Sequence, residues 1–357
     1  MKTYTKFLVS IFLNSIFNVF LIIFCLIFVL NLLTELEFFK DIQVSIYYPL
    51  YFSFLNTPSF VFDVFPFIFL LSTQLFFNNL FDNDQLEIFK YSGLKNSKIL
   101  SIINITAFVL GIFIIFFFYN LSSNVKSLYL QLKTNYTQDD KYLAVITNNG
   151  LWIKDVINSK TLMINAAKID KNFLVDTYIS EFDQNFQIVK NIKSKRIDIS
   201  KNEWIIYNPE VYEQNYKINK KMLKLNTNFN YNIIQNLFSN LSSLSLFDLW
   251  EMRKNYKKLS YSLTDIDLQL MKLVSYPLYL VLMTMLSAII MFNTKKFNNK
   301  YTKIILGFFC SVVIYYLTNF FYVLGSTEKI NLAVSIASPL LILFLINIYF
   351  VRNINAK

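Results

Sequence analysis

Six long apolar segments limit what this chain can fold into more than any other feature of its sequence. A helix needs about 20 predominantly apolar residues to cross the ~30 Å hydrocarbon core of a bilayer. Segments of that kind lie at 7–33, 59–81, 99–119, 271–292, 304–324 and 332–351. We therefore predict six membrane-spanning helices, three before and three after a long polar interval.

A cleavable signal peptide is the competing interpretation of the first segment. Segment 7–33 is longer than the apolar core of a signal peptide, which has about 7–15 residues, and no A-x-A-like cleavage site follows it. We therefore treat this segment as a membrane span.

The composition supports a membrane protein and excludes several kinds of chemistry. Only 16% of the residues are charged, against about 25% in soluble domains. The net charge of +11 would suit nucleic acid or an anionic membrane, and the hydropathy favours the membrane. The absence of histidine excludes His-based triads and His-ligated metal sites. The two cysteines lie in apolar segments, so no disulfide framework is expected.

Lysine and arginine in short loops predict the orientation of the spans. One set of span ends carries eleven basic residues, whereas the opposite short loops carry only Lys40 and Lys329. We therefore predict that both termini are cytoplasmic and that the polar interval is periplasmic. The eleven are Lys2, Lys6, Lys90, Lys95, Lys98, Lys295, Lys296, Lys300, Lys303, Arg352 and Lys357.

The interval 121–270 predicts an inserted all-β domain. Short β-branched and aromatic runs recur there between polar turn residues, a pattern typical of a sandwich, barrel or jelly roll. Its end, 245–269, has helical spacing and predicts a helix leading to the fourth span. The predicted strands are 142–147, 151–153, 161–166, 173–179, 186–190, 195–199, 203–207 and 211–216, with breaks at 148–150, 183–185, 200–202 and 208–209.

Charge within the insert leaves two interpretations open. From Lys126 to Lys272 there are 21 basic and 15 acidic residues. Such a surplus usually marks a solvated face, and it also suits an anionic ligand.

Motifs for catalysis are missing from the sequence. The five glycines are too sparse for a P-loop or a dinucleotide-binding loop, and no Cys or His cluster could ligate a metal. We therefore expect a non-enzyme with no cofactor and no catalytic or metal-binding residues. Asp63 is the only acid inside the predicted spans, which makes it a candidate for a transport role or an interfacial carboxylate.

Three features together resemble the LptF/LptG permease family of the lipopolysaccharide export ABC transporter. The first is the order of three spans, a β domain and three spans. The second is the loop 83–93, ending in Ser92 and Gly93, and the third is the strand sequence 149–155. Segment 244–278, with its proline at the fourth span, resembles the LptG branch, as does the motif Gly150, Leu151, Trp152, Lys154 and Asp155.

The resemblance implies a fold and a set of partners. It implies transmembrane helices 1–3 in residues 1–120, a periplasmic jelly-roll-like domain in 121–270 and helices 4–6 in 271–357, in an inner membrane. It also implies a second permease of the family, a cytosolic ABC ATPase dimer that hydrolyses ATP, and periplasmic jelly-roll bridge proteins. The cargo would be lipopolysaccharide, with no nucleic-acid partner.

The family's ATPase-coupling helix would correspond to residues 82–93. Leu86 and Phe89 would form its apolar docking side and Gly93 its C-cap. An amphipathic helix lying on the membrane surface is the alternative. The family usually has an acid where Gln85 stands, so we expect Asp84 and Glu87 to substitute for it.

The first and fifth spans would form the family's lateral lipid gates. In the first span we expect the lipid at Phe28, Asn31, Leu32 and Phe38. Glu35 and Glu37 occupy a region where the family tends to carry lysine, which suggests a less phosphorylated headgroup or cations from the partner permease.

Two other functions fit the sequence less well. An ABC permease for lipoprotein export or force transmission would also need an ATPase, but such families commonly have four spans. A membrane-anchored assembly protein would have neither an ATPase partner nor lipid in its core.

Overall fold

The computed structural model describes residues 3–42, 44–133, 136, 151–157, 160–170, 172–213, 216–231, 233–234, 240–258, 261–293 and 300–351. They form two compact units, a helical unit from residues 1–126 and 264–357 and a β unit from residues 127–263. The predicted strand 142–147, Gly150, and the basic residues Lys2, Lys295, Lys296, Arg352 and Lys357 lie outside the described residues.

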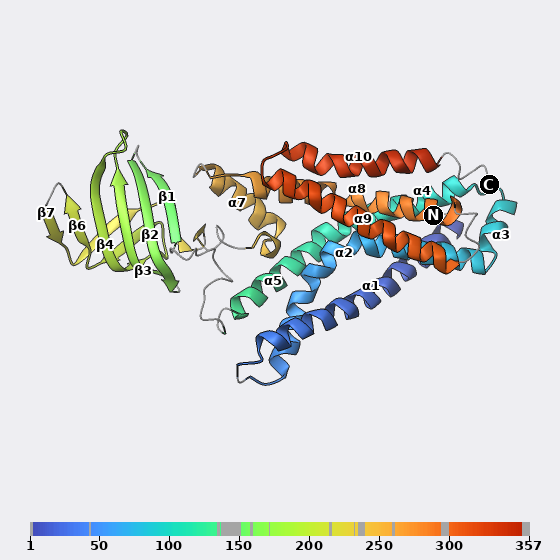
Figure 1. The fold of residues 1–357 in the computed structure, drawn as a ribbon, viewed down its shortest axis with the longest axis horizontal. Coiled ribbons are helices and arrows are strands. Elements are labelled where there is room, and N and C mark those ends of the chain that lie inside the picture. Colours follow the sequence, from blue (N-terminus) through green and yellow to red (C-terminus); the bar gives the residue numbers. More distant parts are fainter. Residues whose placement is uncertain are drawn as a thin grey trace. The chain divides into compact units, whose positions relative to one another are not determined.

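The helical unit contains the long apolar helices that the sequence predicted (Figure 1). Six helices among the described residues are long and apolar enough to cross a membrane, so the predicted number of spans is confirmed. The helices are α1 (Thr3–Phe38), α2 (Tyr47–Asp82), the short α3 (Gln85–Tyr91), α4 (Asn96–Phe113) continuing through the π-helix η1 (Ile114–Tyr119) into α5 (Asn120–Lys133), then α8 (Thr264–Asn293), α9 (Lys300–Ser326) and α10 (Leu332–Val351).

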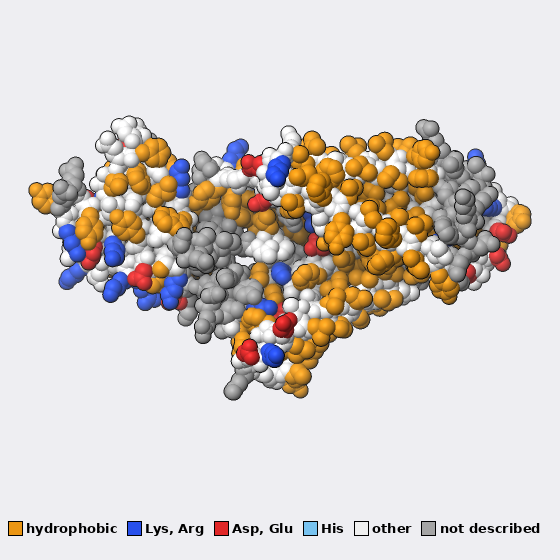
Figure 2. Space-filling view, in the orientation of Figure 1, with side chains coloured by type: hydrophobic (Ala, Val, Ile, Leu, Met, Phe, Trp, Pro, Cys, Tyr) orange, Lys and Arg blue, Asp and Glu red, His pale blue; other side chains and the backbone are white. Residues whose placement is uncertain are grey.

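Helices α2 and α8 form the interior of this unit. Helix α1 packs along α2, while α4, α9 and α10 pack on α8. Much of the surface of α1, α9 and α10 is hydrophobic, as Figure 2 shows for one face of the unit. Apolar side chains on the outside of a helical bundle are expected where the surroundings are lipid rather than water.

Hydrogen bonds from buried polar side chains join the helices. Gln74 on α2 donates to the Lys303 carbonyl on α9 at 2.9 Å, and Ser287 on α8 donates to the Leu70 carbonyl at 2.7 Å. Asn347 on α10 donates to the Leu282 carbonyl at 3.0 Å. Such bonds hold membrane helices together where apolar burial provides no net driving force.

The β unit is built on one antiparallel sheet, which curls into a half-barrel (Figure 1). The main strand order is β1-β2-β3-β4-β5-β8, and β6 pairs with β4 and β7. The insertion of a β domain between the third and fourth spans is therefore confirmed. The strands are β1 (Leu151–Ile157), β2 (Lys160–Asp170), β3 (Phe173–Phe182), β4 (Ile188–Asp198), β5 (Glu203–Tyr207), β6 (Glu210–Glu213), β7 (Tyr216–Asn219) and β8 (Met222–Asn226).

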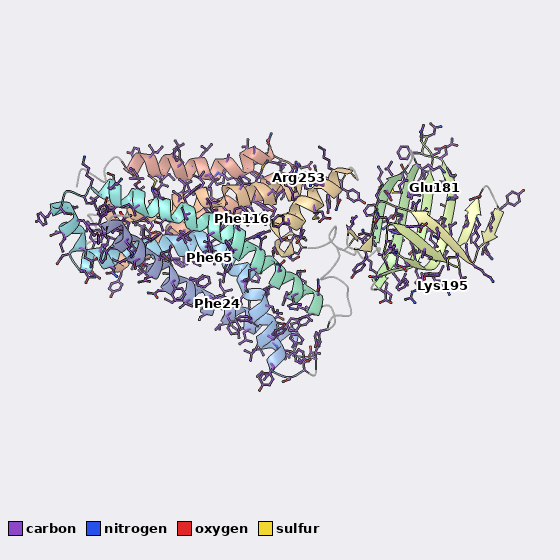
Figure 3. All side chains as sticks on the ribbon, turned by 180° about the vertical axis from the view of Figure 1, so that it is seen from behind. Phe24, Phe65, Phe116, Glu181, Lys195 and Arg253 are labelled. Atoms are coloured by element: carbon purple, nitrogen blue, oxygen red, sulfur yellow. The ribbon has the colours of Figure 1, made fainter. Side chains whose placement is uncertain are left out.

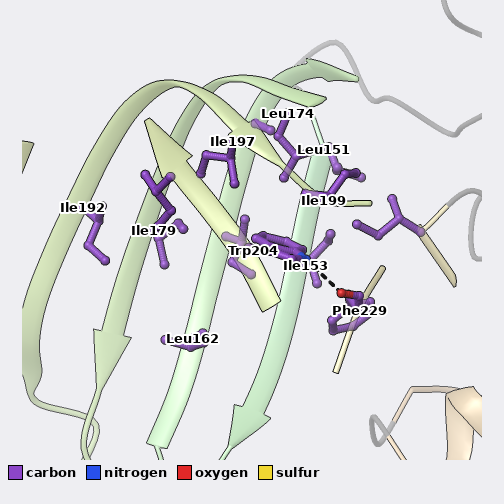
Figure 4. Close-up of a cluster of buried hydrophobic side chains, with 14 of the residues drawn as sticks. Leu151, Ile153, Leu162, Leu174, Ile179, Ile192, Ile197, Ile199, Trp204 and Phe229 are labelled. Atoms are coloured by element: carbon purple, nitrogen blue, oxygen red, sulfur yellow. Dashed lines mark hydrogen bonds between the residues drawn. The ribbon is translucent and has the colours of Figure 1, made fainter. Parts of the chain in front are cut away.

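Alternating residues of the strands form the core of the sheet. In β1, Leu151 and Ile153 are buried while Trp152 and Lys154 are exposed, as the period of two in a strand requires. Trp204 lies at the centre of the core, and its indole N–H donates to the Phe229 carbonyl at 2.8 Å (Figure 4). This bond satisfies the one polar group that Trp204 takes into the core.

Two stretches differ from the sequence-based prediction. The predicted strands 186–190 and 195–199 are largely one strand, β4, because its pairing with β3 runs from Ile188 to Asp198 through the polar residues between them. The predicted helix 245–269 is divided between α7 (Leu246–Lys258) and the first turns of α8. The short 3₁₀ helix η4 (Leu241–Ser243) precedes α7.

Candidate functional site

Helix α3, in the segment predicted to couple to an ATPase, has a well-defined C-terminus. Gly93 lies in the left-handed region with φ 81°. Its N–H donates to the Lys90 carbonyl, and the Leu94 N–H donates to the Phe89 carbonyl, both at 2.9 Å. This pair of bonds is a Schellman motif, which is why glycine suits the position. At the other end, Asp84 lies outside the helix with φ 55°.

The face of α3 that contacts the rest of the chain contains the residues predicted to dock on the ATPase. Leu86 is buried, and the Phe89 ring lies 6.2 Å from that of Phe7 on α1. Both residues therefore take part in contacts within the helical unit, and their role as the docking side stays a prediction. The exposed apolar side chains of α3 are Ile88 and Tyr91, at 62% and 89%. Glu87 is exposed, and the Gln85 amide oxygen has no hydrogen-bond partner among the described residues.

The residues predicted for the lipid gate lie on different faces of α1. Asn31 is buried and donates to the Thr57 hydroxyl of α2 at 3.2 Å, and Glu35 is buried as well. Asn31 therefore faces α2 in this structure, and its place in a lipid gate stays a prediction. Phe28, Leu32 and Phe38 are half-buried. The exposed side chains between residues 26 and 37 are Leu26, Val29, Leu30, Leu33, Thr34, Leu36 and Glu37.

The β-domain motif lies on β1, an edge of the main strand order. Asp155 is buried, and Asn228 donates to it through its backbone N–H at 2.9 Å and its side-chain amide at 2.7 Å. Its role is therefore to fix the segment after β8 against the sheet. The Tyr261 hydroxyl bonds both the N–H and the carbonyl of Lys154, which closes the outer edge of β1 at that residue. Trp152 is 59% exposed.

A charged cluster surrounds Glu181, which lies near the end of β3 (Figure 3). Glu181 on β3 accepts from Lys160 at 2.6 Å and pairs with Lys190 at 2.9 Å. Burial raises the pKa of the Glu181 carboxyl, but the hydrogen bonds and charges of the two lysines outweigh that effect and hold its pKa below the ordinary value of 4.5. The bond to Glu181 raises the pKa of Lys160 in turn.

The helical unit contains a second charged pair, next to a cavity. Asp63 on α2 and Lys272 on α8 form an ion pair of 3.1 Å. Both line a cavity of about 470 Å³ between α2, α8, α9 and α10. Asp63 is recognisable from the sequence as the only acid of the predicted spans, whereas its pairing with Lys272 is not, because 209 residues separate the partners in the chain.

A pattern in the sequence could have indicated this cavity. Ser275, Tyr276 and Tyr279 follow Lys272 at helical spacing, and all of them line the cavity. On α9 the polar residues Ser311, Tyr315, Thr318 and Tyr322 repeat the same spacing within an apolar helix. A polar stripe on each of two spans indicates helix faces that are turned away from the bulk lipid.

Comparison with known families decides the class of protein. The model of a family described as "Lipopolysaccharide export system permease LptF/LptG" matches residues 6–353. The chain belongs to the LptF/LptG permease family. A comparison with curated proteins found no match. LptF/LptG membership implies a permease for lipopolysaccharide export, and with the six apolar helices it indicates a multi-pass protein of the inner membrane. It also implies an export complex that includes a partner permease.

Proposed function

We propose that this chain is one of the two permease subunits of an ABC transporter that extracts lipopolysaccharide from the inner membrane and passes it to a periplasmic bridge. The observation that carries the proposal is the family match over residues 6–353. The three helices before and three after the β unit support it. Within the family we propose an LptG-type subunit, because the sequence from Leu151 to Asp155 resembles that branch.

A cytosolic ABC ATPase dimer would supply the energy through α3. The exposed Ile88 and Tyr91 provide apolar anchors for a groove on the ATPase, while the buried Leu86 transmits the movement to the helical unit. Asp84 and Glu87, both exposed, are the acids available in place of the family's usual one.

The arrangement of the helical unit supports a cytoplasmic location for α3. The first residues of α1, helix α3 and the last residues of α10 lie at one end of this unit (Figure 1). Lys6, Lys90, Lys95 and Lys98 belong to that end, whereas the opposite turns contain Lys40 and Lys329. By the positive-inside rule the lysine-rich end is cytoplasmic, and the β unit is then periplasmic.

Strand addition would connect the β unit to the jelly-roll bridge proteins. Strand β7 pairs only with β6 among the described strands, and all four of its residues are exposed. A partner strand can extend a sheet at such an edge through main-chain hydrogen bonds. The edge of β1 is less suitable, because Tyr261 already bonds Lys154 there.

Purification of the full chain in detergent, followed by mass spectrometry of the proteins and lipids that elute with it, tests the proposal. We expect a P-loop ATPase, a second permease of the family and lipopolysaccharide. An ATPase accompanied by lipoprotein and no lipopolysaccharide would favour the other class of ABC permease. The absence of any ATPase would favour a membrane-anchored assembly protein and overturn the proposal.

A further inference from the structure

The cavity beside Asp63 and Lys272 is large enough to hold a ligand. Its volume of about 470 Å³ lies within the ~300–1,000 Å³ of known ligand sites. Neither α3 nor the exposed face of α1 contributes to its lining. The cavity is therefore separate from the coupling helix and from the exposed face of α1. Helix α9, which does line it, is the fifth span that the family resemblance would make a lipid gate, so the test must compare the bound lipid with lipopolysaccharide.

Polarity changes along the length of the cavity. Lys272 near the start of α8, Tyr322 near the end of α9 and Ser335 near the start of α10 mark one end. Eleven residues further along α8, which is about 16 Å of helix, Met283 lines the other end, together with apolar Val312 and Leu340. A molecule with a polar head and an apolar tail matches this gradient.

The charged end offers one positive and one negative partner. The side chains of Asp63 and Lys272 remain 49% and 37% exposed although they contact each other. The bond to Asp63 uses one of the three N–H donors of the Lys272 ammonium group, and the ring centroid of Tyr322 lies 6.0 Å from that group. The exposed Tyr315 and Tyr316 also line the cavity, so its mouth lies along α9, and a lipid could enter from the side.

We infer that this cavity binds a phospholipid with a phosphoethanolamine headgroup. The phosphate accepts hydrogen bonds from Lys272, the ammonium group pairs with Asp63 and the faces of the tyrosine rings, and one acyl chain occupies the apolar end. A headgroup with both charges suits an ion pair whose net charge is zero. A purely anionic lipid would bring its phosphate beside the Asp63 carboxylate, where the two charges repel.

A photoreactive lipid tests the inference on the full chain in lipid nanodiscs. The probe is phosphatidylethanolamine with a diazirine on one acyl chain, and mass spectrometry maps the labelled peptides. We expect labelling of residues 272–283 and 311–322. Excess unlabelled phosphatidylethanolamine should reduce it at least tenfold, whereas phosphatidylglycerol or free phosphoethanolamine should reduce it less than twofold. Equal competition by either of these compounds overturns the inference, and so does equal competition by lipopolysaccharide, which would assign the cavity to the cargo.

Two neighbouring residues of α9 provide matched variants. Val312 lines the cavity, whereas Val313 does not and is 51% exposed. Val312→Trp should fill the apolar end and lower labelling at least fivefold while the ion pair remains. Val313→Trp should leave labelling unchanged. Unchanged labelling in Val312→Trp overturns the inference.

The headgroup has its own pair of variants. Lys272→Met should lower labelling, whereas Lys98→Met, on the exposed side of α4, should not. Thermal unfolding verifies that each variant is folded. If Lys272→Met does not fold, the test of lipid binding rests on Val312→Trp. Labelling that persists in folded Lys272→Met overturns the headgroup assignment. Copurification of the ATPase should be the same in all four variants, which separates this inference from the proposed function.

Discussion

The hydroxyl of Tyr276 on α8 donates a hydrogen bond to the backbone carbonyl of Phe62 on α2. This carbonyl lacks its usual α-helical donor, because the residue four positions later is Pro66, which has no N–H. The rings of Phe62 and Tyr276 also stack, with centroids 4.7 Å apart. Tyr276, on the fourth span, thus provides the hydrogen-bond donor that Pro66 cannot provide in the second span. This bond lies next to the cavity that Asp63 lines.

Tyr276→Phe should therefore destabilise the helical unit by about 0.6 kcal/mol, the average measured for hydrogen bonds between membrane helices, and by no more than about 1.7 kcal/mol, the largest value. The ring and its stacking stay in place, so the loss reports the hydrogen bond alone. Pro66→Ala restores an N–H that can serve the Phe62 carbonyl within α2. Unfolding in detergent by titration with sodium dodecyl sulfate measures both effects.

The double variant provides the control. In the Pro66→Ala background, Tyr276→Phe should cost close to nothing, since Phe62 then has a helical donor. An equal cost in both backgrounds would mean that Tyr276 stabilises the protein by some means other than the carbonyl that Pro66 leaves open.

The exposed side of α3 gives the second prediction. Replacing Ile88 and Tyr91 with Asp should abolish copurification of the ATPase, because an unpaired charge buried in a groove costs several kcal/mol. Both side chains are exposed in the isolated chain, so its folding should not change. Lys98→Asp, an exposed change on α4, is the control and should keep the ATPase bound.

Leu86→Ala tests the stability of the helical unit and not the docking of the ATPase. Leu86 is buried in its own unit, so its truncation should destabilise the protein by about 2–5 kcal/mol. Normal ATPase binding by the double Asp variant would exclude this face of α3 as the docking surface.

The pKa of Glu181 predicts how the stability of the β unit depends on pH. Its pKa in the folded state lies below 4.5, so its interactions with Lys160 and Lys190 contribute fully above pH 4.5. They are lost as the pH falls through the folded-state pKa. Tryptophan fluorescence reports this unit selectively, because Trp152, Trp204 and Trp250 all belong to it. Thermal unfolding should therefore move to lower temperature in acid, and Glu181→Gln should reduce that change. Glu251→Gln, an exposed change on α7, should not.

The sequence predicted the elements better than it predicted their faces. The six spans are visible as apolar segments, but α2 starts at Tyr47 instead of 59, because buried polar residues such as Ser53 and Thr57 lower the local hydropathy. Their hydroxyls bond carbonyls of their own helix, which makes them compatible with a span. Strands β7 and β8 were missed or only partly predicted, because lysines interrupt their apolar residues.

Faces and partners depend on contacts that a local pattern does not contain. Leu86 and Ile88 are both apolar, and only the position of α1 and α2 decides which of them is buried. The same holds for Asn31, whose partner Thr57 lies on another helix. The ion pair of Asp63 with Lys272 joins two spans that are adjacent in space and distant in sequence.

The burial pattern of α1 gives the last prediction, which concerns lipid entry. Photo-crosslinkers at Leu30 and Leu33 on the exposed face should capture lipopolysaccharide, whereas crosslinkers at Asn31 and Glu35 should not, because these face the protein. Plain contact with bulk lipid would also label exposed residues, so a site of equal exposure on another helix is needed.

Phe116 provides that site. Phe116, which Figure 3 labels, is 61% exposed, and Leu33 is 60% exposed. If α1 lines a lipid gate, capture at Leu33 should exceed capture at Phe116 several-fold in the assembled transporter. Equal capture at Leu33 and Phe116 would mean that the α1 face only contacts the bulk bilayer, because exposure alone would then account for the labelling. Capture at Asn31 as strong as at Leu30 would mean that α1 rotates or separates from α2 during transport, since the bond from Asn31 to Thr57 holds that face against α2 in this structure.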